Sequence, residues 1–65
     1  MNNELINNLR AAYKNNTLES CIESINWEHK MVFDGIATYC KDGITLGICA
    51  GEAPVIATPY GTENL

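Results

Sequence analysis

The stretch Ile36-Ala-Thr-Tyr-Cys-Lys-Asp-Gly-Ile-Thr-Leu-Gly-Ile-Cys-Ala50 decides the fold class of this 65-residue chain. From Ile44 onward, large apolar residues alternate with threonine, glycine and cysteine, which predicts a strand buried on one face. Asp42-Gly43, just before it, is typical of a turn between two antiparallel strands. The second half of the chain is therefore expected to be an antiparallel sheet.

The length of the loop between these two strands decides which side chains share a face. A three-residue loop, 41–43, sets Cys40 opposite Ile44, whereas a two-residue turn sets Lys41 opposite Ile44 and Tyr39 opposite Leu46. We favour the longer loop, because apolar residues then meet across the pair. In that register, one shallow sheet face would present Gly35, Ala37, Tyr39, Thr45, Gly47 and Cys49.

The remaining strand signals lie on either side of this hairpin. Residues 29–40 read as extended, and Asp34-Gly35 is either a bulge within one long strand or a tight turn between two. Pro54 opens a strand over residues 54–58 and indicates an edge position, because proline cannot donate to a ladder. Pro59 and Gly61 mark the expected end of the ordered chain.

The first half of the chain has helical periodicity. A helix is expected over about residues 3–14, capped by Asn2 or Asn3 and ending at Asn15-Asn16, and a second over about 18–25, capped by Thr17. The apolar positions, spaced three and four apart, are Leu5, Leu9, Ala12 and Tyr13 in the first helix and Leu18, Cys21, Ile22 and Ile25 in the second.

These elements predict one α+β domain spanning residues 1–65. Two N-terminal helices should pack on one face of a three- or four-stranded antiparallel meander, with strands at about 29–40, 44–50 and 54–58. Trp27 is large enough to anchor the junction between the helices and the sheet. A hydrophobic fraction of 46% sets the chain apart from disordered sequences.

Charge restricts the classes of partner. Eight acidic residues against four basic ones give a formal charge of −4, which disfavours direct binding to nucleic acid and favours a basic protein surface. The N-terminal residues are polar and the chain has no long apolar run, so no membrane partner is expected. An odd number of cysteines fits reduced thiols in the cytoplasm.

The sequence carries no catalytic or cofactor motif. Cys21, Cys40, Cys49 and His29 are four potential zinc ligands, but their spacing lacks the C-x-x-C pairs of structural zinc sites. We therefore expect no metal and no cofactor. A chain this small seldom encloses a pocket of the size that enzymes use, so we expect a protein that is not an enzyme.

Carboxylates and tyrosines are the candidate contacts for a partner. Glu19 and Glu23 share the outer face of the second helix, and Asp34 and Glu52 are expected at one end of the sheet. Aromatic side chains contribute large contact areas to interfaces. The predicted partner-binding residues are Glu19, Glu23, Asp34, Glu52, Tyr39 and Tyr60.

In overall character the chain resembles the small acidic inhibitors of bacteriophages and mobile elements, among them anti-CRISPR proteins. The resemblance rests on length, acidity, the absence of catalytic signatures and the asparagines Asn2, Asn3, Asn7, Asn8, Asn15, Asn16, Asn26 and Asn64. It implies a protein of the host cytoplasm that inhibits a larger protein or ribonucleoprotein complex, by occupying a basic surface or by mimicking DNA. We favour a monomer over a homodimer. The alternative is a structural subunit or homodimer that assembles through the shallow sheet face or the Pro54 strand.

Overall fold

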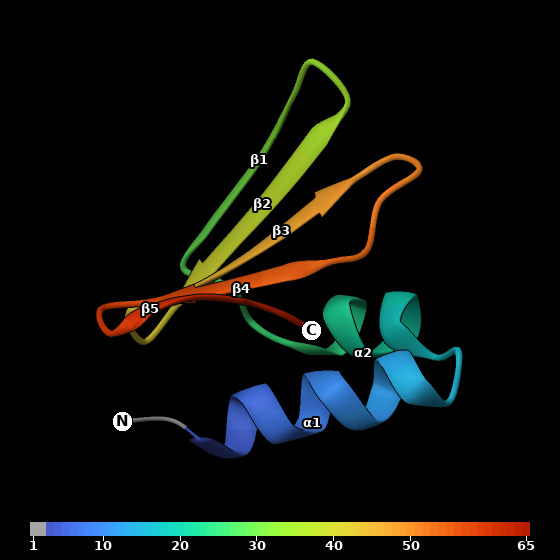
Figure 1. Ribbon diagram of the computed structural model, residues 1–65, viewed down its shortest axis with the longest axis vertical. Helices are drawn as coiled ribbons and strands as arrows, with labels where there is room; N and C mark the ends of the chain where they lie inside the picture. Colours follow the sequence, from blue (N-terminus) through green and yellow to red (C-terminus); the bar gives the residue numbers. More distant parts are fainter. Residues whose placement is uncertain (1–2) are drawn as a thin grey trace.

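The computed structural model describes residues 3–65 and confirms the α+β class (Figure 1). The sheet has five antiparallel strands in sequence order, not three or four. The predicted cap at Asn2 lies outside the described residues. The elements are α1 (Asn3–Lys14), α2 (Leu18–Ser24), β1 (His29–Phe33), β2 (Ile36–Lys41), β3 (Ile44–Cys49), β4 (Val55–Thr58) and β5 (Gly61–Asn64).

The additional strands come from two tight turns. Asp34 and Gly35 both have positive φ and divide the extended segment into β1 and β2, which settles the alternative left open by the sequence. The prediction that order ends near Pro59 is wrong, because the chain reverses there and pairs β5 with β4. The Tyr60 amide donates to the Thr58 hydroxyl (3.1 Å) within this turn.

The β2–β3 hairpin closes through the shorter loop, so the predicted three-residue loop is wrong. Lys41 pairs with Ile44, and Asp42 and Gly43 have φ of 52° and 78°. Turns with two positive φ values match the twist of the flanking strands, which outweighs the unlike pairing of lysine with isoleucine. The Lys41 ammonium donates a hydrogen bond to the Asn26 carbonyl (3.1 Å), and this bond is exposed to solvent.

The register moves Tyr39 to the side of the sheet that the helices cover. The opposite, open face therefore presents Ile36, Thr38 and Cys40 from β2, instead of the predicted Gly35, Ala37 and Tyr39. From β3 it presents the predicted Thr45, Gly47 and Cys49.

The two helices begin and end close to the predicted bounds. Asn16, at the predicted end of the first helix, has a left-handed conformation, with φ of 59°. Thr17 precedes α2 but makes no side-chain cap to it; its hydroxyl donates to the Ala12 carbonyl of α1 instead (3.3 Å). Thr17 thus joins the end of α1 to the start of α2.

The core lies between the helices and the β3–β4 part of the sheet. Its fully buried side chains are Leu9, Leu46 and Ile56, and Leu5, Ile22 and Ile44 complete the cluster. Pro54 is buried, and β4, which it precedes, lies between β3 and β5, so the predicted edge position is wrong. The Pro54 carbonyl accepts a hydrogen bond from the Leu65 amide (2.9 Å).

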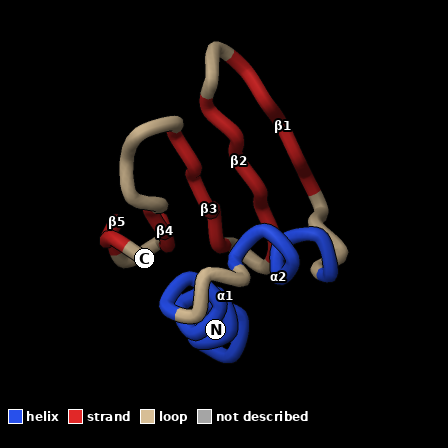
Figure 2. The backbone as a smooth tube through the Cα atoms, turned by 90° about the vertical axis from the view of Figure 1, so that its right-hand side faces the viewer, coloured by secondary structure: helices blue, strands red, loops and turns tan. Residues whose placement is uncertain are grey.

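The β1–β2 hairpin projects beyond the helices, as Figures 1 and 2 both show. Met31, Val32 and Phe33 are 65%, 70% and 76% exposed. The sheet thus has a packed end, formed by β3, β4 and β5 near α1, and a projecting hairpin formed by β1 and β2. Neither α1 nor α2 is long and apolar enough to cross a membrane.

Candidate functional site

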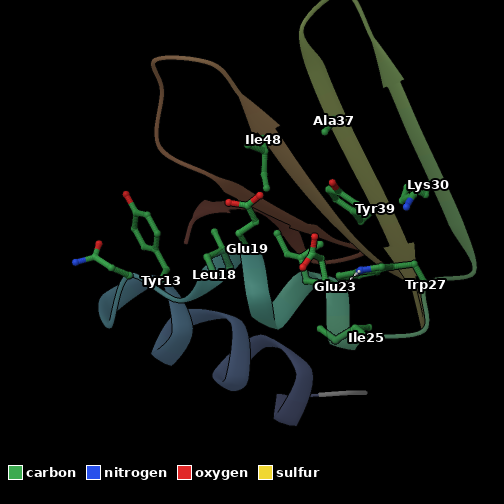
Figure 3. Close-up of a pocket in the computed structure, with 12 residues that line it drawn as sticks. Tyr13, Leu18, Glu19, Glu23, Ile25, Trp27, Lys30, Ala37, Tyr39 and Ile48 are labelled. Atoms are coloured by element: carbon green, nitrogen blue, oxygen red, sulfur yellow. Dashed lines mark hydrogen bonds between the residues drawn. The ribbon is translucent and has the colours of Figure 1, made fainter.

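A groove of about 610 Å³ lies between α2 and the sheet, beneath the projecting hairpin (Figure 3). This volume falls within the range of about 300–1,000 Å³ that ligand sites occupy. It is larger than the small chain length led us to expect. The apolar residues along the groove are Leu18, Ile22, Ile25, Ala37 and Ile48.

One end of this groove depends on the register that the two-residue turn at Asp42-Gly43 sets between β2 and β3. It sets Tyr39 on the helix side of the sheet, where its ring lies 5.3 Å from that of Trp27 at a tilt of 43°. The Trp27 indole N–H donates to the Ile22 carbonyl (3.0 Å), near the end of α2. This bond and the ring contact hold an aromatic wall in place, because each restricts the orientation of Trp27.

Two carboxylates stand on the helical side of the groove. Glu19 and Glu23 lie one turn apart on α2, and Figure 3 shows both pointing into the space between α2 and the sheet. Within residues 3–65, neither has a hydrogen-bond or ion-pair partner. Lys30 lines the opposite side, from β1. The groove therefore has an acidic helical wall and a basic strand wall.

The structure brings three of the six predicted partner-binding residues together. Glu19, Glu23 and Tyr39 all line the groove. Asp34 and Glu52 lie at the other end of the sheet, in the β1–β2 turn and the β3–β4 connection, and no hydrogen bond or ion pair between them is found. The four predicted carboxylates therefore belong to two separate regions, one on α2 and one at the end of the sheet that carries the β1–β2 turn and the β3–β4 connection.

Tyr60 lies away from the groove, in the β4–β5 turn. It is 80% exposed and lines a second hollow of about 450 Å³, together with Arg10 and Glu63. Arg10 and Glu63 form an ion pair that joins α1 to β5. The two predicted aromatic contacts, Tyr39 and Tyr60, therefore belong to different surfaces.

Lys30 and Tyr13 belong to the groove but were not predicted. The register provides a signal for Lys30, because it pairs with Tyr39 and so points to the same side of the sheet. The favoured three-residue loop obscured this signal by assigning Tyr39 to the other face. Tyr13 read as part of the core stripe of α1, and it is 41% exposed at the end of the groove.

The cysteines are free and half-buried. A hydrogen bond with the Glu52 side chain, followed by desolvation and the carboxylate charge, raises the pKa of the Cys49 thiol. A raised pKa lowers the fraction of a thiol that is ionised at neutral pH, and the thiolate is the nucleophilic form. Across residues 3–65, no group of three or more His, Cys, Asp or Glu is placed to hold a metal ion.

Comparison with protein-family models, curated proteins and solved structures finds no match for this chain. The apolar surface and aromatic wall of the groove suit the burial of a side chain, and its partnerless carboxylates suit a cation. These features together favour a ligand that is both basic and apolar.

Proposed function

We propose that this protein is a stoichiometric binding protein that holds a basic, apolar-anchored segment of a larger protein in the groove beside α2. The observation that carries the proposal is the pair of partnerless carboxylates, Glu19 and Glu23, above an apolar surface. Opposite charges steer the encounter and select the partner, and burial of apolar area contributes about 25 cal/mol per Å². The groove supplies both contributions in one place.

The spacing of the carboxylates bears on the form of the segment. Residues four apart on a helix are separated by about 6 Å along its axis. A partner helix with Lys or Arg at the same spacing can place one cation near each carboxylate, with an apolar residue between them directed at Tyr39 and Trp27. An amphipathic basic helix is therefore the form of segment that fits.

The proposed larger partner is a nucleic-acid-handling protein or ribonucleoprotein complex. Basic amphipathic segments are common where proteins contact phosphates, and a net charge of −4 favours association with them. A segment held in the groove is unavailable to nucleic acid, so binding would inhibit the complex. The distance of Asp34 and Glu52 from the groove supports capture of a segment over mimicry of a continuous DNA backbone.

The test uses a synthetic helical peptide with two arginines four residues apart and leucines on the same face. Trp27 is the chain's single tryptophan, so its fluorescence reports occupancy of the groove. We expect saturation at one peptide per chain and weaker binding at higher salt. The combined variant Glu19→Gln/Glu23→Gln should bind about tenfold more weakly, a loss of about 1.4 kcal/mol.

The matched control is Asp34→Asn/Glu52→Gln, which removes the same formal charge away from the groove. It should bind the peptide nearly as well as the unaltered protein. Equal losses in the two double variants would mean that net charge, and not the groove, attracts the peptide. Binding of a peptide with glutamates in place of the arginines, or of duplex DNA, would also contradict the proposal.

A further inference from the structure

The two edges of the sheet differ in how they are protected. β5 is four residues long and carries Glu63, whose ion pair with Arg10 ties that edge to α1. β1 has five exposed residues and belongs to the projecting hairpin; it contains no proline or carboxylate, and its one charged side chain, Lys30, is not tied to a helix by an ion pair within residues 3–65. Natural edge strands are usually short, charged, bulged or covered, because an open edge recruits another strand. β1 is therefore the edge available for pairing.

The ladder fixes which backbone groups of β1 face outward. Phe33 and Ile36 flank the two-residue turn, so they form the hydrogen-bonded closing pair of the hairpin. Hydrogen-bonded pairs recur at every second residue, which directs the N–H and C=O groups of His29, Met31 and Phe33 toward β2. Those of Lys30 and Val32 point away from the sheet, toward any strand that approaches the edge.

We propose that two copies of the chain pair through β1, antiparallel and in register about Val32. The occupant of the open edge is thus a second copy, and the inference is independent of the groove's ligand. In this register Val32 faces Val32 of the second copy, and Lys30 comes beside the β1–β2 turn of that copy, which carries Asp34. Each copy then contributes one Lys–Asp pair across the two-fold axis, so the charges at the edge are self-complementary.

The other registers allowed by the outward-facing groups bring like charges together. A pairing centred on Lys30 sets that ammonium against its own copy. A pairing centred on Met31 sets Glu28 against Asp34. Like charges directly opposite each other destabilise a strand pair, whereas opposite charges contribute about 0.2–1 kcal/mol. Charge complementarity therefore selects the register centred on Val32.

The surroundings of Val32 leave room for this contact. Its side chain is 70% exposed, and its neighbours Met31 and Phe33 are exposed to a similar extent on the other sheet face. Both views show the tip of the hairpin standing clear of the helices (Figures 1 and 2). Within residues 3–65, Lys30 and Asp34 have no ion-pair partner of their own.

Pairing would change both the sheet and the groove. Antiparallel strands related by a two-fold axis perpendicular to the sheet keep the helices of both copies on one side. The result is one continuous ten-stranded sheet. The faces of the two copies that the helices leave uncovered then form one surface. Lys30, engaged by Asp34 of the second copy, would no longer offset Glu19 and Glu23, so each groove becomes more acidic on dimerisation.

The experiment is sedimentation equilibrium of the full chain from micromolar to millimolar concentration. We expect a monomer–dimer equilibrium that Val32→Lys shifts to monomer, because this substitution sets two ammonium groups against each other at the centre of the contact. Thr62→Lys, which adds the same charge to the exposed strand β5, is the matched control and should leave the equilibrium unchanged. Circular dichroism verifies that both variants are folded.

A charge exchange tests the register. Lys30→Glu and Asp34→Lys should each weaken association about tenfold, and the two changes together should restore most of it, since the opposite pair is rebuilt in reverse. A monomer throughout the range, a dimer indifferent to Val32→Lys, or a dimer that the double exchange does not recover would each overturn the inference. Peptide binding is measured separately through Trp27 fluorescence, with Lys30 unaltered and at concentrations where the chain is monomeric, so failure of one proposal is distinguishable from failure of the other.

Discussion

The packed end and the projecting hairpin are built from the same local parts but have different surroundings. The β1–β2 and β2–β3 hairpins both close through an Asp-Gly turn with two positive φ values. At the packed end, Leu46 and Ile56 are fully buried, whereas Val32 on β1 is 70% exposed. The same type of turn thus joins β2 to a buried strand, β3, and to an exposed edge strand, β1. The packing around each strand, and not its turn, decides whether it is buried.

This difference separates stability from binding. Burial of apolar side chains is the main favourable contribution to folding, so most of it comes from the packed end. The hairpin adds little burial, yet it supplies one wall of the groove and the open edge strand. Regions with few buried contacts are also those that open locally at low free-energy cost. We therefore expect the hairpin to be the more dynamic part of the sheet.

The largest expected effect is a loss of global stability when a cavity is introduced into the packed end. Leu46→Ala removes a fully buried side chain and should lower the free energy of unfolding by about 2–5 kcal/mol, which would unfold a large fraction of so small a domain. Val32→Ala should change it by about 0.5 kcal/mol or less. Urea denaturation of the two variants measures the contrast, and similar losses would show that the hairpin shares the core's stability.

Alanine substitutions in the two Asp-Gly turns should have an intermediate effect on stability, and they allow the two hairpins to be compared directly. Gly35 and Gly43 both have φ of 78°, and a Cβ would meet no atom within 4 Å at either. Alanine at each should therefore introduce the same backbone penalty of about 1–2 kcal/mol. At Gly43 we expect the full loss in global stability. At Gly35 we expect it mainly as faster amide exchange in β1, because that hairpin can open without breaking the core.

Gly47→Ala serves as the control for both turns, since Gly47 has ordinary φ and open space for a Cβ. It should leave stability and exchange nearly unchanged. Equal global losses at Gly35 and Gly43 would mean that the sheet unfolds as one unit, and the distinction between its two ends would then not apply.

The helices and the alternation of β3 could be predicted because each depends on the local periodicity of one segment. Leu5 and Leu9 recur at helical spacing, and Ile44 and Leu46 at strand spacing, with no need for a distant partner. The chain's last strand, β5, was missed because it has only four residues and none of them is a large apolar residue. It is held by hairpin pairing with β4 across the Pro59-Tyr60 turn, and the composition of the Gly61–Asn64 segment alone gives no strand signal.

The groove was missed for a related reason. A change of one residue in the β2–β3 loop moves Tyr39 from one sheet face to the other, and that choice balances turn geometry against cross-strand pairing. Pairing preference weighed in favour of the longer loop, whereas turn twist prevails in the structure. Glu19 and Glu23 were correctly placed on one helix face, but what they face depends on the register of a strand about twenty residues away.

The smallest expected effect concerns the protected edge. Glu63→Gln removes the ion pair with Arg10. In this pair the Arg10 side chain is 39% exposed and the Glu63 side chain is 65% exposed. Exposed pairs contribute about 0.2–1 kcal/mol, so global stability should change little, and the change should shrink further in high salt. Amide exchange along β5 should nevertheless increase relative to β4, because the charge contact ties that strand to α1.

Glu52→Gln is the matched control for this last variant, since it neutralises a carboxylate in the connection that precedes β4 without touching the edge. It should leave exchange in β5 unaltered. If Glu63→Gln also promoted association of the chain, the ion pair would be what keeps β5 from recruiting a second copy. The asymmetry between the two edges would then arise from one salt bridge, and β1 would be open simply because it has no equivalent of Arg10 beside it.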